Sequence, residues 1–234
     1  VLFNDMNVDI IIPCFNEDKN IKTLVNSWEE VLSRNSNFFV WFVDNGSKDS
    51  TNKNLRNCLS NTNYENMKVL TIQENKGYGN GIKYGISNSK NEIVCWTHAD
   101  LQIPSVDVEQ IIHEHLKLKN NKVVMKGRRT NRNRLDQSFT FMMSVIGYLF
   151  TGQFIRDINA QPKIVSRELL SDIDNYPDDF LLDAHLLYKL KKQGISINSR
   201  NSNFLKREAN EPKGGGSLLG KIKLSTKTIK YFLN

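Results

Sequence analysis

The first half of the chain repeats one pattern, in which a short apolar run ends in a polar loop and is followed by apolar residues at helical spacing. The runs are Val8–Ile12, Phe38–Val43, Val69–Ile72 and Ile93–Trp96, and a fifth, Val123–Met125, follows an amphipathic segment over Val106–Leu118. Near-continuous apolar runs are typical of strands covered on both faces. Alternating strands and helices favour a mostly parallel sheet between two helical layers. The sequence therefore predicts a three-layer α/β/α fold.

The size and composition of the chain fit one large domain. Its 234 residues are 39% hydrophobic and 24% charged, which is enough to bury a sizeable core. The three cysteines, Cys14, Cys58 and Cys95, are odd in number and far apart. This favours buried thiols in a reducing compartment, so we expect a cytoplasmic protein without a signal segment. The apolar run Phe139–Ile155 is interrupted by polar residues and is shorter than the roughly 20 residues of a membrane span.

The positive charge of the chain is concentrated in two places. The net charge is +7, and Lys126–Arg134 contains five basic residues and no acidic one. From Lys189 onward there are eleven Lys or Arg residues against Glu208 and Glu211. Such clusters indicate anionic partners, which include nucleotide phosphates, a membrane surface and nucleic acid.

Potential metal ligands follow the strand expected at Ile93–Trp96. His98, Asp100 and Gln102 alternate along the chain directly after it. Alternate side chains of an extended segment point the same way, so these three can converge on one cation and the phosphates that it neutralises. In parallel sheets, ligands bind at the carboxyl ends of strands. The alternative is an ordinary turn at a strand end.

Four loops together carry a family resemblance. They are Ile12–Glu17, Val43–Thr51, Asn75–Gly77 and Ala99–Gln102. In this order and spacing they resemble the family 2 glycosyltransferases, which have the glycosyltransferase A fold, and most of all the dolichyl-phosphate mannosyltransferase-like branch that acts on polyprenyl phosphates. The resemblance implies an enzyme that binds a uridine or guanosine diphosphate sugar and a divalent Mn²⁺ or Mg²⁺ ion. It also implies sugar transfer with inversion at the anomeric carbon.

The resemblance places a set of donor-binding residues in these loops. They are Pro13, Phe15, Asn16, Glu17, Asp44, Asp49, Lys76, Gly77, Ala99 and Asp100. A carboxylate at a strand end, such as Asp44, can accept hydrogen bonds from a base or a ribose. Asp49 has a second interpretation, because a carboxylate at this position can also cap the helix that follows.

The Asp-x-Asp motif of the family corresponds here to His98-Ala99-Asp100, so the first carboxylate is replaced. The expected metal ligands are Asp100, Gln102 and His98. Imidazole suits Mn²⁺ better than Mg²⁺, so His98 either binds a softer metal, donates to a phosphate, or leaves the metal to Asp100 and Gln102.

The expected acceptor-binding residues follow the nucleotide half of the chain: they are Arg129, Arg134, Ser138 and Gln161. Arg134 and Ser138 repeat an Arg-x-x-x-Ser pattern of the family, and this spacing puts both on one face of a helix. A guanidinium group and a hydroxyl group together can hold a phosphate, which favours a polyprenyl phosphate acceptor. The alternative acceptor is a sugar hydroxyl of a growing cell-envelope polysaccharide. The apolar run Phe139–Phe154 is either a core helix or a surface that meets lipid.

Three residues are expected to have catalytic roles, namely Asp100, Asp183 and Arg207. A hydroxyl acceptor must lose a proton during attack, whereas a lipid phosphate is already ionised, so Asp183 is either a general base or a residue that caps or orients. Arg207 is expected to stabilise the leaving diphosphate, unless it belongs to a plain linker before Gly214–Ser217. His113, His115 and His185 are expected on helix surfaces.

We expect a donor-binding half over residues 1–127, an acceptor-binding half over residues 128–217 and a basic amphipathic tail over residues 218–234. The tail favours peripheral binding at the inner face of the cytoplasmic membrane. No nucleic-acid partner is expected, since the sequence contains no nucleic-acid-binding motif. The competing class is a non-catalytic basic protein that binds nucleotides or nucleic acid.

Overall fold

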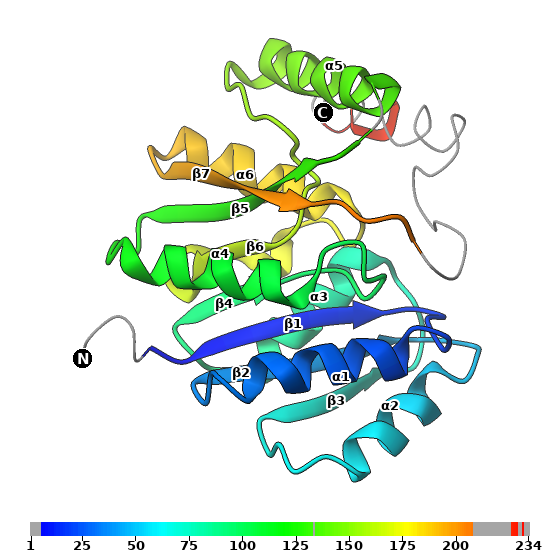
Figure 1. Ribbon diagram of the computed structural model, residues 1–234. Coiled ribbons are helices and arrows are strands. Elements are labelled where there is room, and N and C mark those ends of the chain that lie inside the picture. The colour runs from blue at the N-terminus through cyan, green and yellow to red at the C-terminus, as the bar shows by residue number, and fades with distance from the viewer. Residues whose placement is uncertain (1–5, 133, 208–225, 229–230, 232–234) are drawn as a thin grey trace.

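A computed structural model describes residues 6–132, 134–207, 226–228 and 231 of the chain. Its centre is a seven-stranded sheet with the order β3-β2-β1-β4-β6-β5-β7 (Figure 1). The strands are β1 (Val8–Cys14), β2 (Phe38–Asn45), β3 (Met67–Ile72), β4 (Ile93–Trp96), β5 (Val123–Thr130), β6 (Lys163–Ser166) and β7 (Ser196–Asn203). The first four strands are mutually parallel, and β5 is parallel to β7. β6 runs antiparallel to both of its neighbours, β4 and β5.

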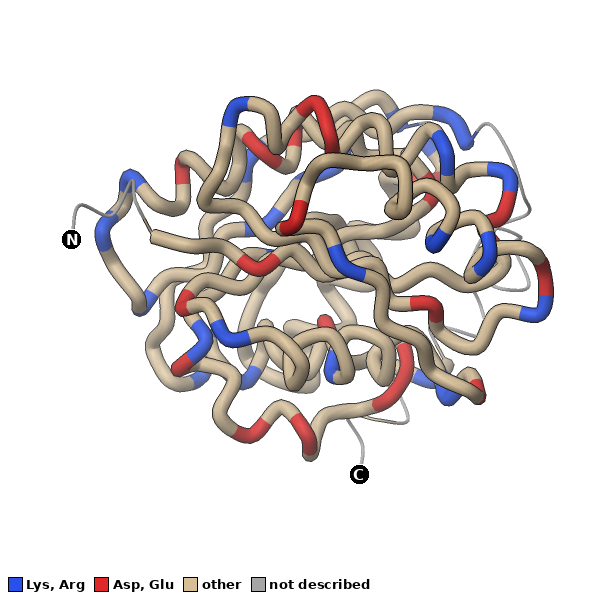
Figure 2. The backbone as a smooth tube through the Cα atoms, turned by 90° about the horizontal axis from the view of Figure 1, so that it is seen from below, with Lys and Arg blue, Asp and Glu red and all other residues tan. Residues whose placement is uncertain are grey.

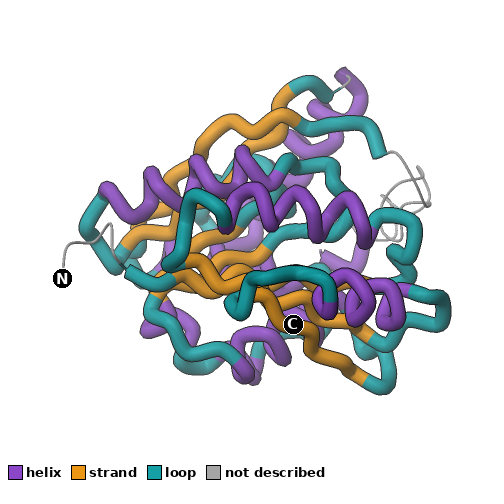
Figure 3. Tube along the Cα trace, turned by 60° about the horizontal axis from the view of Figure 1, so that its bottom comes forward, coloured by secondary structure: helices purple, strands orange, loops and turns teal. Residues whose placement is uncertain are grey.

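Six α-helices connect the strands in the described part of the chain. They are α1 (Ile21–Leu32), α2 (Thr51–Ser60), α3 (Tyr78–Asn88), α4 (Ser105–Lys117), α5 (Arg134–Thr151) and α6 (Leu181–Lys192). Two short 3₁₀ turns, Arg167–Leu170 and Ile173–Asn175, precede α6. Helices lie on both sides of the strands in Figure 3. The predicted three-layer α/β/α arrangement with a mostly parallel sheet is confirmed.

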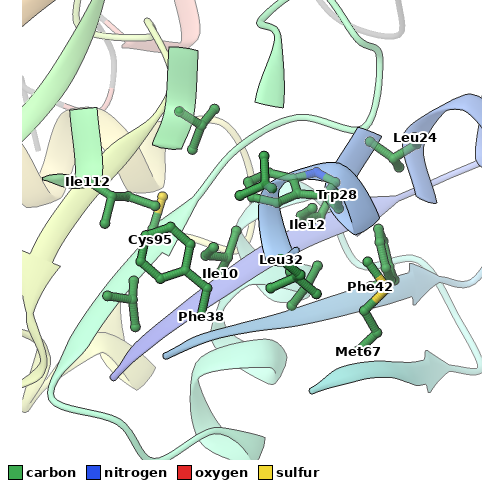
Figure 4. Close-up of a cluster of buried hydrophobic side chains, with 14 of the residues drawn as sticks. Ile10, Ile12, Leu24, Trp28, Leu32, Phe38, Phe42, Met67, Cys95 and Ile112 are labelled. Atoms are coloured by element: carbon green, nitrogen blue, oxygen red, sulfur yellow. The ribbon is translucent and has the colours of Figure 1, made fainter. Parts of the chain in front are cut away.

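The alternation of side chains along β1 produces two hydrophobic cores, one on each face of the sheet. Ile10 and Ile12 point toward α1, α2 and α4, and Ile11 points toward α3 and α6. Trp28 and Leu32 of α1 cover the first core above Ile10 and Ile12 (Figure 4). Because both faces are covered, most residues of β1 and all four residues of β4 are apolar.

Helix α5 differs from the other helices in its burial. It lies beyond the β5 and β7 side of the sheet (Figure 1), and only Ser144 and Gly147 are buried on it. Leu135 is 82% exposed and Leu149 is 73% exposed. Of the two interpretations of this apolar run, the structure favours the exposed surface over the core helix.

One expectation about the fold was wrong. His115 is not on a surface, because it is only 3% exposed and lies one helical turn from Ile111 and Ile112 on the buried face of α4. His185 is half-buried on the face of α6 that also carries Lys189 and Lys192, with its ring packed against Tyr176 at a centroid distance of 4.3 Å. Strand β6 was also missed. Most of the tail expected over residues 218–234, and the Gly214–Ser217 segment before it, lie outside the described residues.

Candidate functional site

A cavity of about 560 Å³ opens where β1, β2, β3 and β4 end. The loops after these strands contribute Pro13, Phe15, Glu17, Asn45, Gly77 and Asp100 to its wall. The opposite wall comes from the second half of the chain and includes Arg129, Arg132, Phe139, Gln161, Asp183 and Arg207. The carboxyl ends of parallel strands are the usual place for a ligand in such sheets.

The loops after β1 and β2 are joined by a set of hydrogen bonds. The backbone N–H of Asn16 donates to Ser47 Oγ at 3.0 Å, and Asn16 Oδ1 accepts from the backbone of Lys48 at 2.8 Å. The backbone N–H of Glu17 donates to the buried hydroxyl of Thr51 at 2.7 Å. Asn16 has a positive φ of 51°, a conformation that asparagine tolerates better than most residues. We call the part of the cavity formed by the loops after β1 to β4 the donor end, because the sequence places the expected donor residues there. Asn16 shapes this end but does not line the cavity.

Asp44 and Asp49 also lie outside the cavity lining, and both support the loops. Asp44 is buried and accepts from the backbone of Ser47 at 3.1 Å and from Asn52 Nδ2 at 2.8 Å. Asp49 accepts from the backbone of Thr51 at 2.9 Å at the start of α2, and from the backbone of Asp18 at 3.2 Å. Thr51 contributes most to lowering the pKa of Asp49, against the opposing effect of burial. This geometry supports the capping interpretation of Asp49, whereas donor contacts of Asp44, Asp49 and the exposed Lys76 stay predictions.

Asp100 stands at the centre of the donor end. It is 7% exposed, and its Oδ1 accepts from the backbone N–H of Gln102 at 3.1 Å. Its Oδ2 is paired with Arg207, which also lies 3.6 Å from Glu17. Between Asp100 and Gln102, Leu101 has a positive φ of 59°, and a strained turn at such a place is often found in functional sites. The ion pair with Asp100 places Arg207 on the cavity wall, and its approach to a diphosphate stays a prediction.

His98 lines the cavity beside Asp100, and its ring lies 5.2 Å from the ring of Tyr78. Burial lowers the pKa of His98, although Asp100 and Asp183 oppose this effect. A buried imidazole with a lowered pKa is neutral near pH 7, and a neutral ring is the form that binds metal.

The donor set fits a divalent metal that arrives with a diphosphate. No cluster of three or more His, Cys, Asp or Glu side chains with ligand geometry occurs in the described ranges. Mg²⁺ sites in nucleotide enzymes use one or two carboxylates, with phosphate oxygens and water completing the shell. Asp100 can supply one such carboxylate, and His98 and Gln102 lie on the same wall.

We call the part of the cavity formed by the second half of the chain the acceptor end, because the sequence places the expected acceptor residues there. It contains a pair of arginines, Arg129 and Arg132. Arg129 forms a bidentate ion pair with the buried Asp157, and both guanidinium groups, of Arg129 and Arg132, lie over the ring of Phe204 at 5.4 and 5.8 Å. Burial would raise the pKa of Asp157, but the charge and hydrogen bonds of Arg129 outweigh it and lower the pKa. Arg132 donates to Thr140 at 2.7 Å, and its buried Nε has no partner among the described residues.

The structure brings a different arginine into the cavity from the one that the sequence indicated. Arg134 and Ser138 are exposed and do not line the cavity. Arg132 and Thr140 line it instead, together with Phe139. The family pattern indicates Arg129 and Arg134, of which Arg129 lines the cavity and Arg134, the first residue of α5, does not. The acceptor contacts of Arg134 and Ser138 stay predictions.

Asp183 has both of its oxygens occupied. Oδ1 accepts from Trp96 Nε1 at 3.0 Å, and Oδ2 accepts from Gln161 Nε2 at 2.7 Å and lies 3.3 Å from Lys163 Nζ. Asp183 is 2% exposed and Lys163 is fully buried. Burial lowers the pKa of Lys163, and Asp183 opposes that effect. The geometry is that of an orienting carboxylate that receives three donors.

Two close backbone contacts hold the walls of the cavity together. A Cβ atom at Gly127 would lie 1.9 Å from the carbonyl oxygen of Gln161, so only glycine lets β5 pass the segment before β6. Gly77 has a φ of 128°, and a Cβ atom there would lie 2.4 Å from the carbonyl oxygen of Asp178. Both glycines therefore fix the two halves of the chain in contact.

The sequence also matches a known family. The profile described as Glycosyl transferase family 2 matches residues 9–173. The chain belongs to this family. The match extends from β1 past β6, so it includes most of both cavity walls.

Characterised relatives are distant from this family member. The dolichyl-phosphate beta-glucosyltransferase of Homo sapiens is 24% identical over 200 residues, which cover 77% of this chain and 62% of that protein. The enzyme of the same name from Dictyostelium discoideum is 24% identical over 216 residues, which cover 83% of this chain and 65% of that protein. The chain thus spans just under two thirds of the length of these relatives.

Solved structures share its fold, which is the glycosyltransferase A fold that the resemblance implied. Glucosyl-3-phosphoglycerate synthase of Mycobacterium tuberculosis, solved with Mn²⁺, UDP and glucosyl-3-phosphoglycerate, has a TM-score of 0.71 at 15% identity, over 97% of this chain and 78% of that one. A mannosyltransferase of Pyrobaculum calidifontis, solved with GDP-Man and Mn²⁺, has a TM-score of 0.67 at 18% identity, over 95% of this chain and 64% of that one.

Proposed function

We propose that this family 2 member is an inverting glycosyltransferase that moves a sugar from a nucleoside diphosphate, with uridine or guanosine as the base, to the phosphate of a polyprenyl lipid. The observation that carries the proposal is the state of Asp183, the carboxylate of α6 that lines the cavity. Its Oδ1 accepts from Trp96, and its Oδ2 accepts from Gln161 and lies beside the ammonium group of Lys163. With both oxygens engaged, Asp183 is poorly placed to take a proton from an acceptor, so the site favours a nucleophile that is ionised before it binds.

The alternative acceptor, a sugar hydroxyl, would need Asp183 as its general base. That role would require Asp183 to give up a hydrogen bond from Trp96 or Gln161, or its contact with Lys163. Leaving a buried ammonium group without its counter-charge is costly. The lipid phosphate is therefore the acceptor that this geometry supports best.

The acceptor end combines charge with apolar surface. Arg129 and Arg132 provide two guanidinium groups against the single partly shared carboxylate of Asp157. Phe139, Met143, Phe180 and Leu181 line the same cavity. A phosphate can bind the arginines while the first isoprene units contact the apolar side chains.

The donor end holds the leaving group. Arg207 can move from Asp100 and Glu17 to the diphosphate, and Asp100 then becomes free to bind a divalent metal together with the phosphates. When bound, such an ion neutralises the charge that develops on the leaving diphosphate. His98 and Gln102 are the further candidate ligands.

The reaction is a single displacement. An oxygen of the acceptor phosphate attacks the anomeric carbon from the face opposite the diphosphate, the new carbon–oxygen bond forms, and the bond to the diphosphate oxygen breaks. The nucleoside diphosphate leaves with that electron pair. The nucleophile is already an anion, so no residue of the chain has to remove a proton, and the chain's residues align the two substrates and stabilise the leaving diphosphate.

We further propose that α5 binds a membrane surface, as a peripheral contact at the inner face of the cytoplasmic membrane. Leu135, Met142 and Leu149 are seven residues apart, so they lie along one exposed stripe. Phe139, Thr140 and Met143 of the same helix line the cavity. An interfacial helix of this kind would place the acceptor end beside the lipid headgroups. In the described ranges, no helix is long and apolar enough to cross a bilayer.

A transfer assay tests the proposal. Labelled UDP- and GDP-sugars are supplied with Mn²⁺ and one of three acceptors: a polyprenyl phosphate, the same polyprenol without phosphate, or a soluble oligosaccharide. We expect label in the lipid only when the phosphate is present. Transfer to the polyprenol or the oligosaccharide at a comparable rate would contradict the assigned acceptor.

A further inference from the structure

A hydrogen-bonded amide lies on the wall of the cavity between its two ends. Gln161 is 1% exposed, and its Nε2 donates to Asp183 Oδ2 at 2.7 Å and to the hydroxyl oxygen of Tyr78 at 2.8 Å. A carboxylate accepts and does not donate, so the NH₂ group of the amide must face Asp183. The orientation of the amide is thereby fixed. Its Oε1 is left without a hydrogen-bond partner among the described residues.

The hydroxyl of Tyr78 has an unused hydrogen-bond donor, which complements the unused acceptor of Gln161. Its oxygen accepts from Gln161, and none of the hydrogen bonds between described residues uses its proton. The ordinary pKa of a tyrosine hydroxyl is about 10, so the phenol keeps this proton at neutral pH. Tyr78 is thus a neutral donor next to a neutral acceptor, and both side chains line the cavity.

Packing holds both side chains in place. The ring of Tyr78 stacks on Phe180 with a centroid distance of 4.9 Å and an interplanar angle of 12°, and its other neighbour is His98 at 5.2 Å. Asp183 is itself fixed by Trp96 and Lys163. A fixed donor and a fixed acceptor with unused hydrogen-bonding capacity are costly to bury, unless a ligand satisfies them.

We infer that Tyr78 and Gln161 together recognise one hydroxyl group of the sugar that is transferred, a role that rests on the proposed function. A sugar hydroxyl both donates and accepts, so it can donate to Gln161 Oε1 and accept from the hydroxyl of Tyr78. Both residues line the cavity together with Asp100 and Asp183: Gln161 donates to Asp183, and the ring of Tyr78 lies beside His98, two residues before Asp100. A site built to bond a hydroxyl discriminates strongly against the analogue that lacks it, because the buried polar groups are then left unpaired.

The experiment measures how tightly the protein binds nucleotide sugars, and therefore needs no acceptor. Calorimetry with Mn²⁺ compares the preferred nucleoside diphosphate sugar, its monodeoxy analogues and the free nucleoside diphosphate. The variants are Tyr78→Phe and Gln161→Met, which remove the two hydrogen-bonding groups at nearly constant size. Tyr84→Phe is the matched control, because Tyr84 is an exposed tyrosine on the same helix.

For the parent, we expect one deoxy analogue to bind about tenfold more weakly than the full sugar. Tyr78→Phe and Gln161→Met should each weaken binding of the full nucleotide sugar and leave the affinity for that analogue unchanged. The ratio of the two affinities then falls toward one. Binding of the free nucleoside diphosphate should be unaltered, and Tyr84→Phe should match the parent.

Equal weakening for every sugar would overturn the inference and assign the pair a merely structural role. If Gln161→Met does not fold, Tyr78→Phe alone decides the question in the same way. A parent that binds nucleotide sugars but does not distinguish any deoxy analogue also overturns the inference and leaves the proposed function standing. A parent that binds no nucleotide sugar overturns both.

Discussion

Asp100 is the residue on which the donor end depends most. It is the carboxylate that follows β4 in the cavity, and it exchanges Arg207 for a metal in the proposed reaction. We predict that Asp100→Ala removes the Mn²⁺-dependent part of nucleoside diphosphate binding and leaves the fold intact, because a loop carboxylate contributes little to the core. Calorimetry with and without Mn²⁺ measures the effect. Equal affinity in variant and parent would remove Asp100 from the site.

A second variant, Arg207→Ala, removes the other partner of the ion pair with Asp100. The guanidinium group of Arg207 now occupies Asp100 Oδ2, so Arg207→Ala should raise the affinity for Mn²⁺ alone and lower the affinity for the nucleoside diphosphate. Lys206→Ala changes an exposed cation next to it and should alter neither affinity. If Arg207→Ala lowered both affinities, the competition between Arg207 and the metal would be refuted.

His115 is a buried histidine away from the cavity, and it links stability to pH. Burial lowers the pKa of His115 to about 4 from its ordinary value of 6.5. Between these values the unfolded chain binds a proton and the folded chain does not, so stability is complete above about pH 6.5 and falls as the pH drops toward 4. The loss amounts to about 3 kcal/mol at most, by the conversion of one pKa unit to roughly 1.4 kcal/mol.

The variant His115→Leu should reduce the fall in the free energy of unfolding between pH 6.5 and pH 4, and His113→Leu, at a half-exposed position on the same helix, should not. Urea unfolding at pH values from 4 to 7 checks both. If the free energy of unfolding of His115→Leu falls as much as that of the parent, other groups cause the acid sensitivity. The position of His115 was predictable, because it continues the buried spacing of Val108, Ile111 and Ile112 along α4.

Among the strands and helices, β6 is the clearest case of an element that could not be predicted from the sequence. The four parallel strands were predictable from their largely apolar runs, whereas Lys163–Ser166 has only two apolar residues, between a lysine and a serine. The carbonyl oxygen of Ala160 accepts from that lysine and the carboxylate of Asp183 pairs with it, and the long-range contact with Asp183 leaves no local pattern. The sequence for the same reason located Asp183 and Gln161 near the site but not the network between them.

The contact between β6 and α6 can be tested through the ion pair of Lys163 with Asp183. Asp183→Asn leaves the buried ammonium group of Lys163 without its counter-charge, so it should destabilise the protein by about 3–5 kcal/mol. Adding Lys163→Met should recover much of this loss. Chemical denaturation of the parent, both single variants and the double variant measures the coupling. Additive effects of the two substitutions would show that the pair is not energetically coupled.

Helix α5 carries the prediction about membranes. Leu135→Glu with Leu149→Glu places two charges on the exposed stripe, so binding to vesicles that contain anionic phosphatidylglycerol should fall at least tenfold. The control is Val106→Glu, at a residue of similar chemistry that is 42% exposed on α4. Vesicle sedimentation measures both. If the two variants bind alike, another surface makes the contact.

At the scale of the whole molecule, Lys and Arg lie on several sides of the fold, with Asp and Glu among them (Figure 2), so the net charge of +7 does not by itself locate a partner. The site depends instead on how the fold joins two regions. The loops after β1 to β4 form the donor end, and β5, α5 and α6 form the acceptor end. Of the expected donor residues, six line the cavity, namely Pro13, Phe15, Glu17, Gly77, Ala99 and Asp100, and their donor contacts stay predictions. The presence of Arg132 rather than Arg134 on the cavity wall depends on the three-dimensional path of the chain. The expected boundaries at residues 127 and 217 stay predictions.

In the proposed reaction the sugar passes to a phosphate oxygen with inversion. Proton and phosphorus NMR of the lipid product, formed from an α-linked nucleoside diphosphate sugar and a polyprenyl phosphate, tests this directly. We predict a β-linked sugar phosphodiester, with coupling between the anomeric proton and phosphorus. A product with the sugar on a hydroxyl oxygen, or with a retained α linkage, would contradict it.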